Sequence, residues 1–212
     1  MAKDVKTKTA CEPRPYHHGD LRRALIEAAR EIVVRDGVQS LSLRAVAREA
    51  GVSPAAPYHH FKDKQELMLA VGRLGFEDLG FAMKAAVDKA GSDPGARLTE
   101  IGVAYVLYAR SNPAIYRLMY DCSRDLEALP HQEHEKEMDG YELVRQCMID
   151  VGRAAAGDEI GIELATIAAW CAAHGVAEMA SFAQFEPLKV ELGGEVNFYR
   201  ELIKRVGAFS GR

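Results

Sequence analysis

The features that mark an enzyme or a disulfide-stapled protein are missing from this chain of 212 residues. No nucleophile elbow, phosphate-cradling glycine loop or metal-ligand helix motif occurs, so no motif supports a catalytic activity. The cysteines share no C-x-x-C spacing and form no obvious pair, which favours reduced thiols; they are Cys11, Cys122, Cys147 and Cys171. We therefore expect no enzyme and no cofactor. An enzyme whose site is revealed by no motif stays open as an alternative.

Signals for export or membrane insertion are also missing. Residues 1–16 contain lysines and threonines but no apolar core, so we expect no signal peptide. The longest weakly polar run extends from Leu164 to Ala183 and is interrupted by Thr166, His174 and Glu178. These interruptions favour a buried helix over a membrane span. We expect a cytoplasmic protein with no membrane partner.

The chain has little histidine clustering that would hold a metal. The pair His17-His18 has no other ligand at useful spacing nearby, and His131-x-x-His134 lies among glutamates. A solvated, charged surface is the preferred interpretation of the second pair, although its spacing is compatible with a metal. We expect no metal site.

The formal net charge of −4 divides unevenly along the chain. Residues 1–70 hold 12 Lys/Arg against 9 Asp/Glu, a balance of +3, and the remainder holds 15 against 22, a balance of −7. The N-terminal third is therefore the part suited to a polyanion, although a solvated mixed surface would have a similar balance. The polar arm Met1 to Arg14 fits either a minor-groove contact or a disordered tail.

No strand-like alternation occurs, and the periodicity predicts helices throughout. In the first third the predicted helices run from Asp20 to Asp36-Gly37, from Ser42 to Gly51, after Ser53, and from Lys64 to Lys89 or Ala90. Gly72, Gly75 and Gly80 in the last of these mark either close packing or a break. The later helices are predicted to start at Asp93-Pro94 and Asn112-Pro113, then to span about Glu135 to Ala156, Ile160 to Ala183 and Glu195 to Phe209, with breaks at Gly157 and around Pro187.

The stretch from Ser42 to Leu67 organises the rest of the chain. Ser42 is a plausible N-cap, Gly51 suits the end of that helix, and Ser53-Pro54 is a further start signal. Two helices joined by a tight glycine-containing turn form a helix-turn-helix. The second helix begins with small residues that allow close approach to a surface, and a recognition helix places its N-terminal residues at base edges.

The next helix also begins with a clear signal. Asp63-x-x-Glu66 predicts a cap, with Asp63 as the N-cap residue. Lys64 lies in the first turn, where the helix dipole disfavours a positive charge, so we expect an external anion to compensate it.

The segment LSLRAVAREAGVSPAAPYHHFKDKQELMLAV resembles the DNA-binding signature of the TetR family of transcriptional regulators. The residues that fall where that family expects them are Ala47, Gly51, Val52, Ser53, Tyr58, Phe61, Lys64 and Leu67. With the preceding helix, the resemblance covers about residues 17–70. One departure is Pro57, where an aliphatic residue is more usual. Proline removes a backbone donor, so we expect an irregular recognition helix.

The resemblance implies a homodimeric, ligand-responsive regulator of transcription, most often a repressor, that binds double-stranded operator DNA. Ser42, Tyr58, His59 and Lys64 would hold phosphates, and Ser53, Ala55 and Ala56 would lie nearest the bases; Arg44 and Pro54 complete the expected DNA-contacting set. A helix-turn-helix used only for packing, and a helical module that binds small molecules or proteins without DNA, are the alternatives.

His174-Gly175 follows Trp170 at a spacing of four residues, about one helical turn. They resemble the Trp–His–Gly pattern of a C-terminal domain found in one branch of TetR-type regulators; ordinary core packing is the alternative. The resemblance implies that the last two long helices pair with a second copy of the chain. The small and apolar residues 168–173 permit such close approach, but an internal core would also use them.

An apolar cavity with a few polar groups is the usual effector site. The residues of the second domain that would line one, each of which simple core packing also explains, are Tyr105, Tyr108, Tyr116, Met119, Met148, Trp170 and His174. The effector itself is unknown.

The sequence therefore predicts an all-α protein. A three-helix helix-turn-helix head would be joined to a C-terminal helical bundle for ligand binding and dimerisation. The expected divisions are a flexible arm at 1–16, the DNA-binding domain at 17–63, a connecting helix at 64–90 and the C-terminal domain at 91–212.

Overall fold

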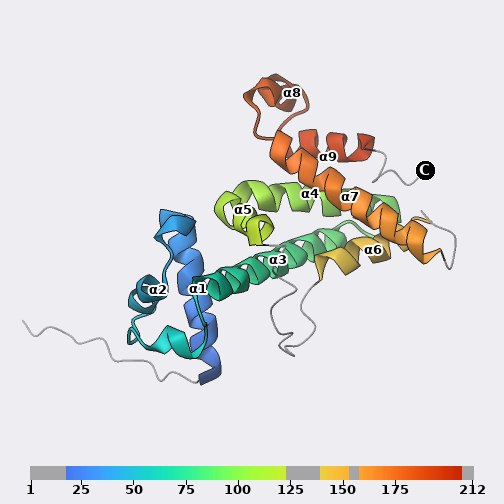
Figure 1. Ribbon diagram of the computed structural model, residues 1–212. Coiled ribbons are helices and arrows are strands. Elements are labelled where there is room, and N and C mark those ends of the chain that lie inside the picture. The colour runs from blue at the N-terminus through green and yellow to red at the C-terminus, as the bar shows by residue number, and fades with distance from the viewer. Residues whose placement is uncertain (1–17, 123–138, 153–157, 207–212) are drawn as a thin grey trace, which may run out of the picture.

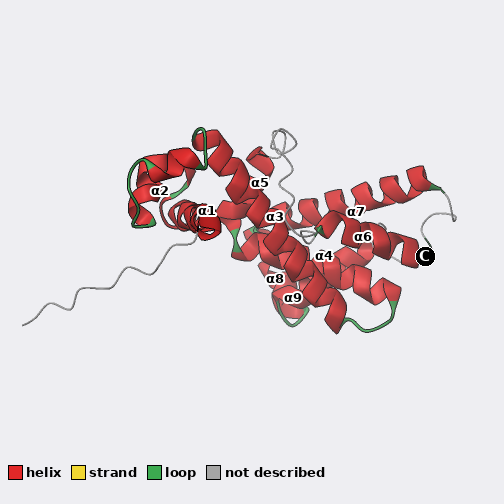
Figure 2. Ribbon diagram, turned by 90° about the horizontal axis from the view of Figure 1, so that it is seen from below, coloured by secondary structure: helices red, strands yellow, loops and turns green. Residues whose placement is uncertain are grey.

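The computed structural model describes residues 18–122, 139–152 and 158–206. Every regular element in these ranges is a helix, and Figure 2 shows no strand among them. The N-terminal arm, His17, the pair His131/His134, Gly157 and Phe209 lie outside the described residues, as do the side chains of residues 18–20.

The head is formed by α1 (His18–Asp36), η1 (Val38–Ser40), α2 (Leu43–Glu49) and η2 (Ala56–His59), which lie together at one end of the molecule (Figure 1). One apolar face of α1 forms the core of this head, with Leu25, Ala29 and Ile32 buried. Gly37 ends the helix with φ +81°, a conformation that glycine adopts without strain. The predicted start of this helix at Asp20 is two residues late, because α1 already begins at His18.

Helix α3 (Lys64–Lys89) runs without a break from the head to the C-terminal domain (Figure 1). Gly72 and Gly75 mark close packing against α5 (Pro113–Cys122), and Gly80 lies against Gly140, the first residue of α6 (Gly140–Asp150); none of them breaks the helix. A Cβ atom at Gly75 would lie 2.7 Å from Met119 Cγ and 2.9 Å from Ile115 Cγ2, which is closer than van der Waals contact permits. The absence of a side chain at Gly75 therefore lets the two helices approach.

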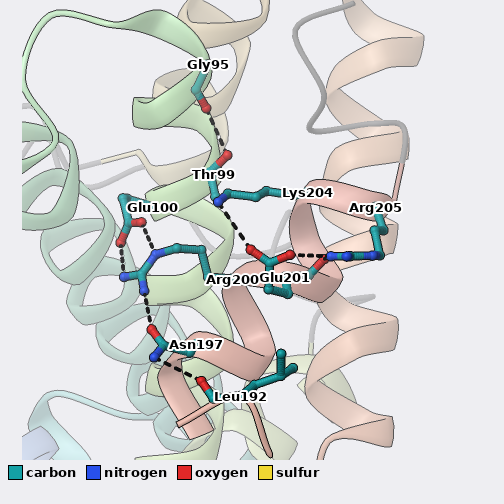
Figure 3. Close-up of polar contacts among 9 residues, drawn as sticks. All are labelled: Gly95, Thr99, Glu100, Leu192, Asn197, Arg200, Glu201, Lys204 and Arg205. Atoms are coloured by element: carbon teal, nitrogen blue, oxygen red, sulfur yellow. Dashed lines mark hydrogen bonds and ion pairs between the residues drawn. The ribbon is translucent and has the colours of Figure 1, made fainter. Parts of the chain in front are cut away.

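The C-terminal domain is arranged around α4 (Pro94–Ser111), which packs against α3, α6 (Gly140–Asp150), α7 (Glu159–Met179) and α9 (Glu195–Arg205). Helix α4 starts where predicted, and Asp93 caps it, since its carboxylate accepts from the Ala96 amide at 2.7 Å. Figure 3 shows how α9 docks onto α4. The Arg200 guanidinium donates to both carboxylate oxygens of Glu100, at 2.6 and 3.1 Å, and also to Asn197.

Several predictions for the helices of this domain are wrong. Helix α6 ends at Asp150 rather than Ala156, because the chain turns at Gly152 with φ +67°. Helix α7 ends at Met179 rather than Ala183. The region around Pro187 is not a loop but a short helix, α8 (Glu186–Glu191), preceded by η4 (Ala183–Phe185). Proline is tolerated there because it lies in the first helical turn, where its missing N–H has no partner to lose.

The prediction that α7 is a buried helix is also wrong for the single chain. One face, which includes Thr166, Ala169 and Ala173, packs against α4 and α6, whereas Ile160 and Leu164 on the other face are 75% and 61% exposed. With 21 residues and a mean hydropathy of 1.4, α7 could cross a membrane on length and composition alone, which is weak evidence of a span. The single chain leaves an apolar stripe of α7 uncovered.

Candidate DNA-binding surface and effector site

The first helix of the helix-turn-helix is fixed at both ends. At its start, Ser42 accepts a hydrogen bond from the Ala45 amide at 3.1 Å, so the predicted N-cap is confirmed. At its end, the Glu49 carboxylate receives two hydrogen bonds from the Arg35 guanidinium of α1, at 2.8 and 2.9 Å. These bonds lower the pKa of Glu49. Gly51 then turns the chain with φ +68°.

The second helix of the motif is not an α-helix, so that part of the prediction is wrong. Residues 54 and 55 form a turn, and Ala56–His59 form the short 3-10 helix η2. The Ser53 carbonyl accepts from the Ala56 amide at 3.0 Å, an i to i+3 bond. In an α-helix the amide of residue 57 would bond to this carbonyl, but Pro57 has none. The irregularity predicted at Pro57 is thus confirmed.

The start of α3 is fixed by hydrogen bonds to two carboxylates, those of Asp63 and Glu66, and by the buried ring of Phe61. Asp63 accepts from the Glu66 amide at 3.0 Å, which confirms the predicted N-cap. The Glu66 carboxylate accepts from the Lys62 amide at 2.7 Å, one residue before the Asp63 amide that a capping box would use. Phe61 is buried beside α1, where the Arg22 guanidinium lies 5.1 Å from the centre of its ring.

The ammonium group of Lys64 has an internal partner that the sequence did not predict. Its Nζ donates to the backbone carbonyl of Val38 at 3.0 Å, so this lysine ties α3 to the segment that follows α1. An ammonium group has three donors. Lys64 can therefore hold Val38 and still donate to an external anion.

The residues expected to contact DNA all reach solvent. Those that are exposed are Ser42, Arg44, Ser53, Pro54, Ala55, Tyr58 and His59, and those that are half-buried are Ala56 and Lys64. Tyr58 is 54% exposed, which is unusual for an aromatic ring in a packed head. Pro57, between these residues, is buried. The segment thus packs against the head through Pro57, while its neighbouring side chains are exposed or half-buried.

Four of the seven residues expected to line an effector pocket meet in one hydrogen-bonded cluster. Tyr105 of α4, Tyr116 of α5 and His174 of α7 converge, with His174 Nδ1 2.6 Å from the Tyr116 hydroxyl and 3.2 Å from the Tyr105 hydroxyl. Trp170 donates from Nε1 to the Tyr120 hydroxyl at 3.1 Å, and Tyr120 also bonds to Tyr105. Burial raises the pKa of all three tyrosines, so they remain protonated hydroxyls.

Tyr120 belongs to the cluster but was not among the predicted pocket residues, although its four-residue spacing from Tyr116 places both on one face of α5. Three predicted residues do not join the cluster. Met119 packs against Gly75 of α3, and Met148 is buried on α6. The Tyr108 hydroxyl is buried with no hydrogen-bond partner in the described part of the chain, and burial raises its pKa to about 12.

The aromatic cluster is closed. Next to Tyr105 and Trp170 there is a cavity of only about 10 Å³, which is marginal even for one water molecule. Two larger clefts, of about 470 and 480 Å³, lie between α3 and α5 and between α3 and α4, and neither is lined by a predicted effector residue. Within the described ranges, no group of three His, Cys, Asp or Glu side chains is placed to hold a metal.

Known proteins resemble both halves of the chain. The sequence model described as "Bacterial regulatory proteins, tetR family" matches residues 25–71, and the model described as "Tetracyclin repressor-like, C-terminal domain" matches residues 98–202. The HTH-type transcriptional regulator BetI of Brucella canis is 38% identical over 80 residues. That alignment covers 38% of this chain and only 40% of BetI.

Two solved structures extend the likeness to nearly the whole chain. A protein of unknown function from Rhodococcus sp. RHA1 is 31% identical, with a TM-score of 0.66 over 93% of this chain and 97% of that chain. A TetR-family transcriptional regulator from Bordetella parapertussis is 14% identical, with a TM-score of 0.55 over 89% of this chain and 95% of that chain. At 14% identity, the second likeness shows the fold alone.

Proposed function

The chain belongs to the TetR family of bacterial regulatory proteins, and we propose that it is a sequence-specific DNA-binding regulator of transcription. The observation that carries this function is the exposed segment from Ser53 to His59, which follows the glycine turn of a helix-turn-helix. Its small side chains permit close approach to a duplex, and such segments read base edges in the major groove. We propose no catalytic activity, and a repressor acting in the cytoplasm is the mode that fits the family.

The DNA contacts divide into two sets. Side chains that can donate to phosphates lie at the helix starts and at the far end of the exposed segment; they are Ser42, Arg44, His59 and Lys64. Because the Ser42 oxygen accepts its capping bond, its hydroxyl proton is available to a phosphate. The residues that approach the bases are Ser53, Pro54, Ala55 and Ala56. Phosphate contacts position the protein, whereas base contacts specify the sequence.

We propose a homodimer centred on α7, whose uncovered stripe includes Ile160, Leu164 and Ile167. The sequence assigned the interface to the last two long helices, α7 and α9. Helix α9 packs on α4 with Phe198 and Ile203 buried, and its exposed residues include Glu195, Lys204 and Arg205, so we place the apolar centre of the interface on α7. A large exposed apolar patch of this kind marks a protein contact. Two copies would place two heads on successive turns of the duplex.

We propose that an effector acts through the cluster of Tyr105, Tyr116, Tyr120, Trp170 and His174. These residues join α7, the proposed dimer helix, to α5, which packs against α3 and α1. Because the cluster is closed, a ligand must separate its rings, and that movement would be passed to the heads. Differential affinity for the two arrangements would then shift the population away from DNA. A compound that raises the melting temperature and also lowers DNA affinity would support this role.

Salt-dependent binding tests the DNA-binding function and one of its contacts. We would titrate a duplex from the protein's own promoter region, at several salt concentrations, and follow fluorescence anisotropy. Lys64→Ala should weaken binding to every sequence and reduce the slope of log K against log salt by about 0.9. Lys84→Ala is the matched control, because Lys84 lies at the far end of the same helix and pairs with Asp88.

This test distinguishes a wrong assignment of Lys64 from a wrong assignment of the DNA-binding function. An unchanged slope for Lys64→Ala, in protein with a normal melting temperature, would remove Lys64 from the phosphate contacts. Wild-type protein that ignores DNA at low ionic strength would overturn the function itself. It would favour a helical module that binds small molecules or proteins.

A further inference from the structure

Three backbone bonds of the exposed segment skip one residue fewer than those of an α-helix, and an i to i−4 bond follows only at its end, from the Phe61 amide to the Pro57 carbonyl at 2.9 Å. The Ala56 amide donates to the Ser53 carbonyl at 3.0 Å, the Tyr58 amide to Ala55 at 3.2 Å, and the His60 amide to Pro57 at 3.0 Å. Each of these three is an i to i−3 bond. In an α-helix starting at Pro54, the first i to i−4 bond would run from residue 57 to the Ser53 carbonyl. Pro57 cannot make it, and its ring would also crowd that carbonyl.

Pro57 therefore sets the pitch of the segment. A 3-10 helix turns about 120° per residue against about 100° in an α-helix, so side chains at i and i+3 eclipse one another. From Ala55 to Tyr58 the two geometries differ by about 60° around the helix axis. Ala55 and Tyr58 are both exposed, whereas Pro57 is buried against the head. The phenol ring of Tyr58 thus rises from the same face as Ala55.

We propose that Pro57 is a positioning residue for DNA sequence recognition, which brings Tyr58 to the base edges beside Ala55 rather than to a phosphate. A phenol hydroxyl both donates and accepts, so Tyr58 can hydrogen-bond to a base edge in the major groove. The methyl groups of Ala55 and Ala56 leave room for a ring of this size in the groove. The inference rests on the proposed DNA-binding function and assigns a further specificity contact within it.

Selection from random-sequence duplexes tests this proposal, because it needs no known operator. The variant to compare with wild type is Pro57→Leu, which restores the amide and keeps an apolar side chain in the buried position. It should select a different sequence at the positions read by this segment. Its affinity for the wild-type sequence should fall about tenfold, while its affinity for unrelated DNA should stay within about twofold. Pro113→Ala, at the start of α5, is the matched loss of a helix-initiating proline and should select the wild-type sequence.

Tyr58→Phe provides a second arm that leaves the segment's backbone unchanged. If Tyr58 reads bases, this variant should lose about tenfold in affinity for the selected sequence and little for unrelated DNA. An equal loss on all sequences would show a phosphate contact and would overturn the proposal. So would a Pro57→Leu variant that selects the wild-type sequence; if that variant does not fold, the Tyr58→Phe result decides. Wild-type protein that enriches no sequence would instead refute the DNA-binding function.

Discussion

Substituting alanine at Gly75 should leave the protein less stable than the same substitution at Gly72. Both glycines are buried in α3, and alanine at either position gains about 1 kcal/mol of helix propensity. At Gly72 the new methyl group would have ordinary contacts, with its nearest neighbours Met119 Cα and Cys122 Cβ at 3.8 and 3.9 Å. Gly72→Ala should therefore stabilise the protein, by up to about 1 kcal/mol.

At Gly75 the same methyl group has no room. It would lie 2.7 Å from Met119 Cγ, 2.8 Å from Met119 Sδ and 2.9 Å from Ile115 Cγ2. Both neighbours are fully buried in α5, and the β-branched Ile115 has little rotamer freedom. Overpacking of this kind costs about 1–3 kcal/mol. Since the propensity gain is common to both variants, the Gly75→Ala protein should be about 1–3 kcal/mol less stable than Gly72→Ala.

Urea unfolding followed by circular dichroism measures this difference directly. Protein concentration must be the same in all samples, because the apparent stability of a dimer depends on it. Comparing m-values checks that both variants expose the same surface on unfolding. Free energies of unfolding for Gly75→Ala and Gly72→Ala that agree within about 0.5 kcal/mol would refute the close α3–α5 packing argued here.

Three further predictions concern other parts of the fold. Glu49→Gln should lower the melting temperature at pH 7, and this difference should vanish in acid. Because the pKa of Glu49 is lowered in the folded protein, the stabilisation by its carboxylate is full above about pH 4.3 and is lost as the pH falls through the folded pKa. A difference in melting temperature that persists at pH 2 would contradict this prediction. Trp170→Phe, which removes the donor to Tyr120, should cost about 1–2 kcal/mol in urea unfolding, and an unchanged midpoint would count against the cluster. Leu164→Asp should give monomers in sedimentation velocity. Val34→Asp, which changes an equally exposed residue of α1, should stay dimeric. Dimeric Leu164→Asp protein would show that the interface does not lie on α7.

The local signals in the sequence located most of the head and the starts of several helices. Ser42, Asp63 and Asp93 are caps in the structure because each cap is a hydrogen bond between neighbours in sequence. The 3-10 form of η2 has an equally local cause in Pro57. The sequence predicted an irregularity there, but the side-chain directions that result need the actual hydrogen bonds.

Features that depend on distant contacts were predicted less well. The uncovered face of α7 and a core helix have the same composition, so the sequence favoured burial. The aromatic cluster requires the registers of three helices, which explains why Tyr120 was missed. Tyr108 does not join the cluster, because residues of one apolar helix point in several directions. It lies near the Arg30–Asp78 ion pair instead.

Footprinting on the protein's own promoter DNA is the most direct test of the account. Two protected half-sites, with centres about one helical turn apart and occupied by two copies of the chain, are the predicted result. Protection should weaken steeply as salt rises. An unprotected promoter at low ionic strength, or a single protected site bound by one copy, would contradict the proposed dimeric regulator.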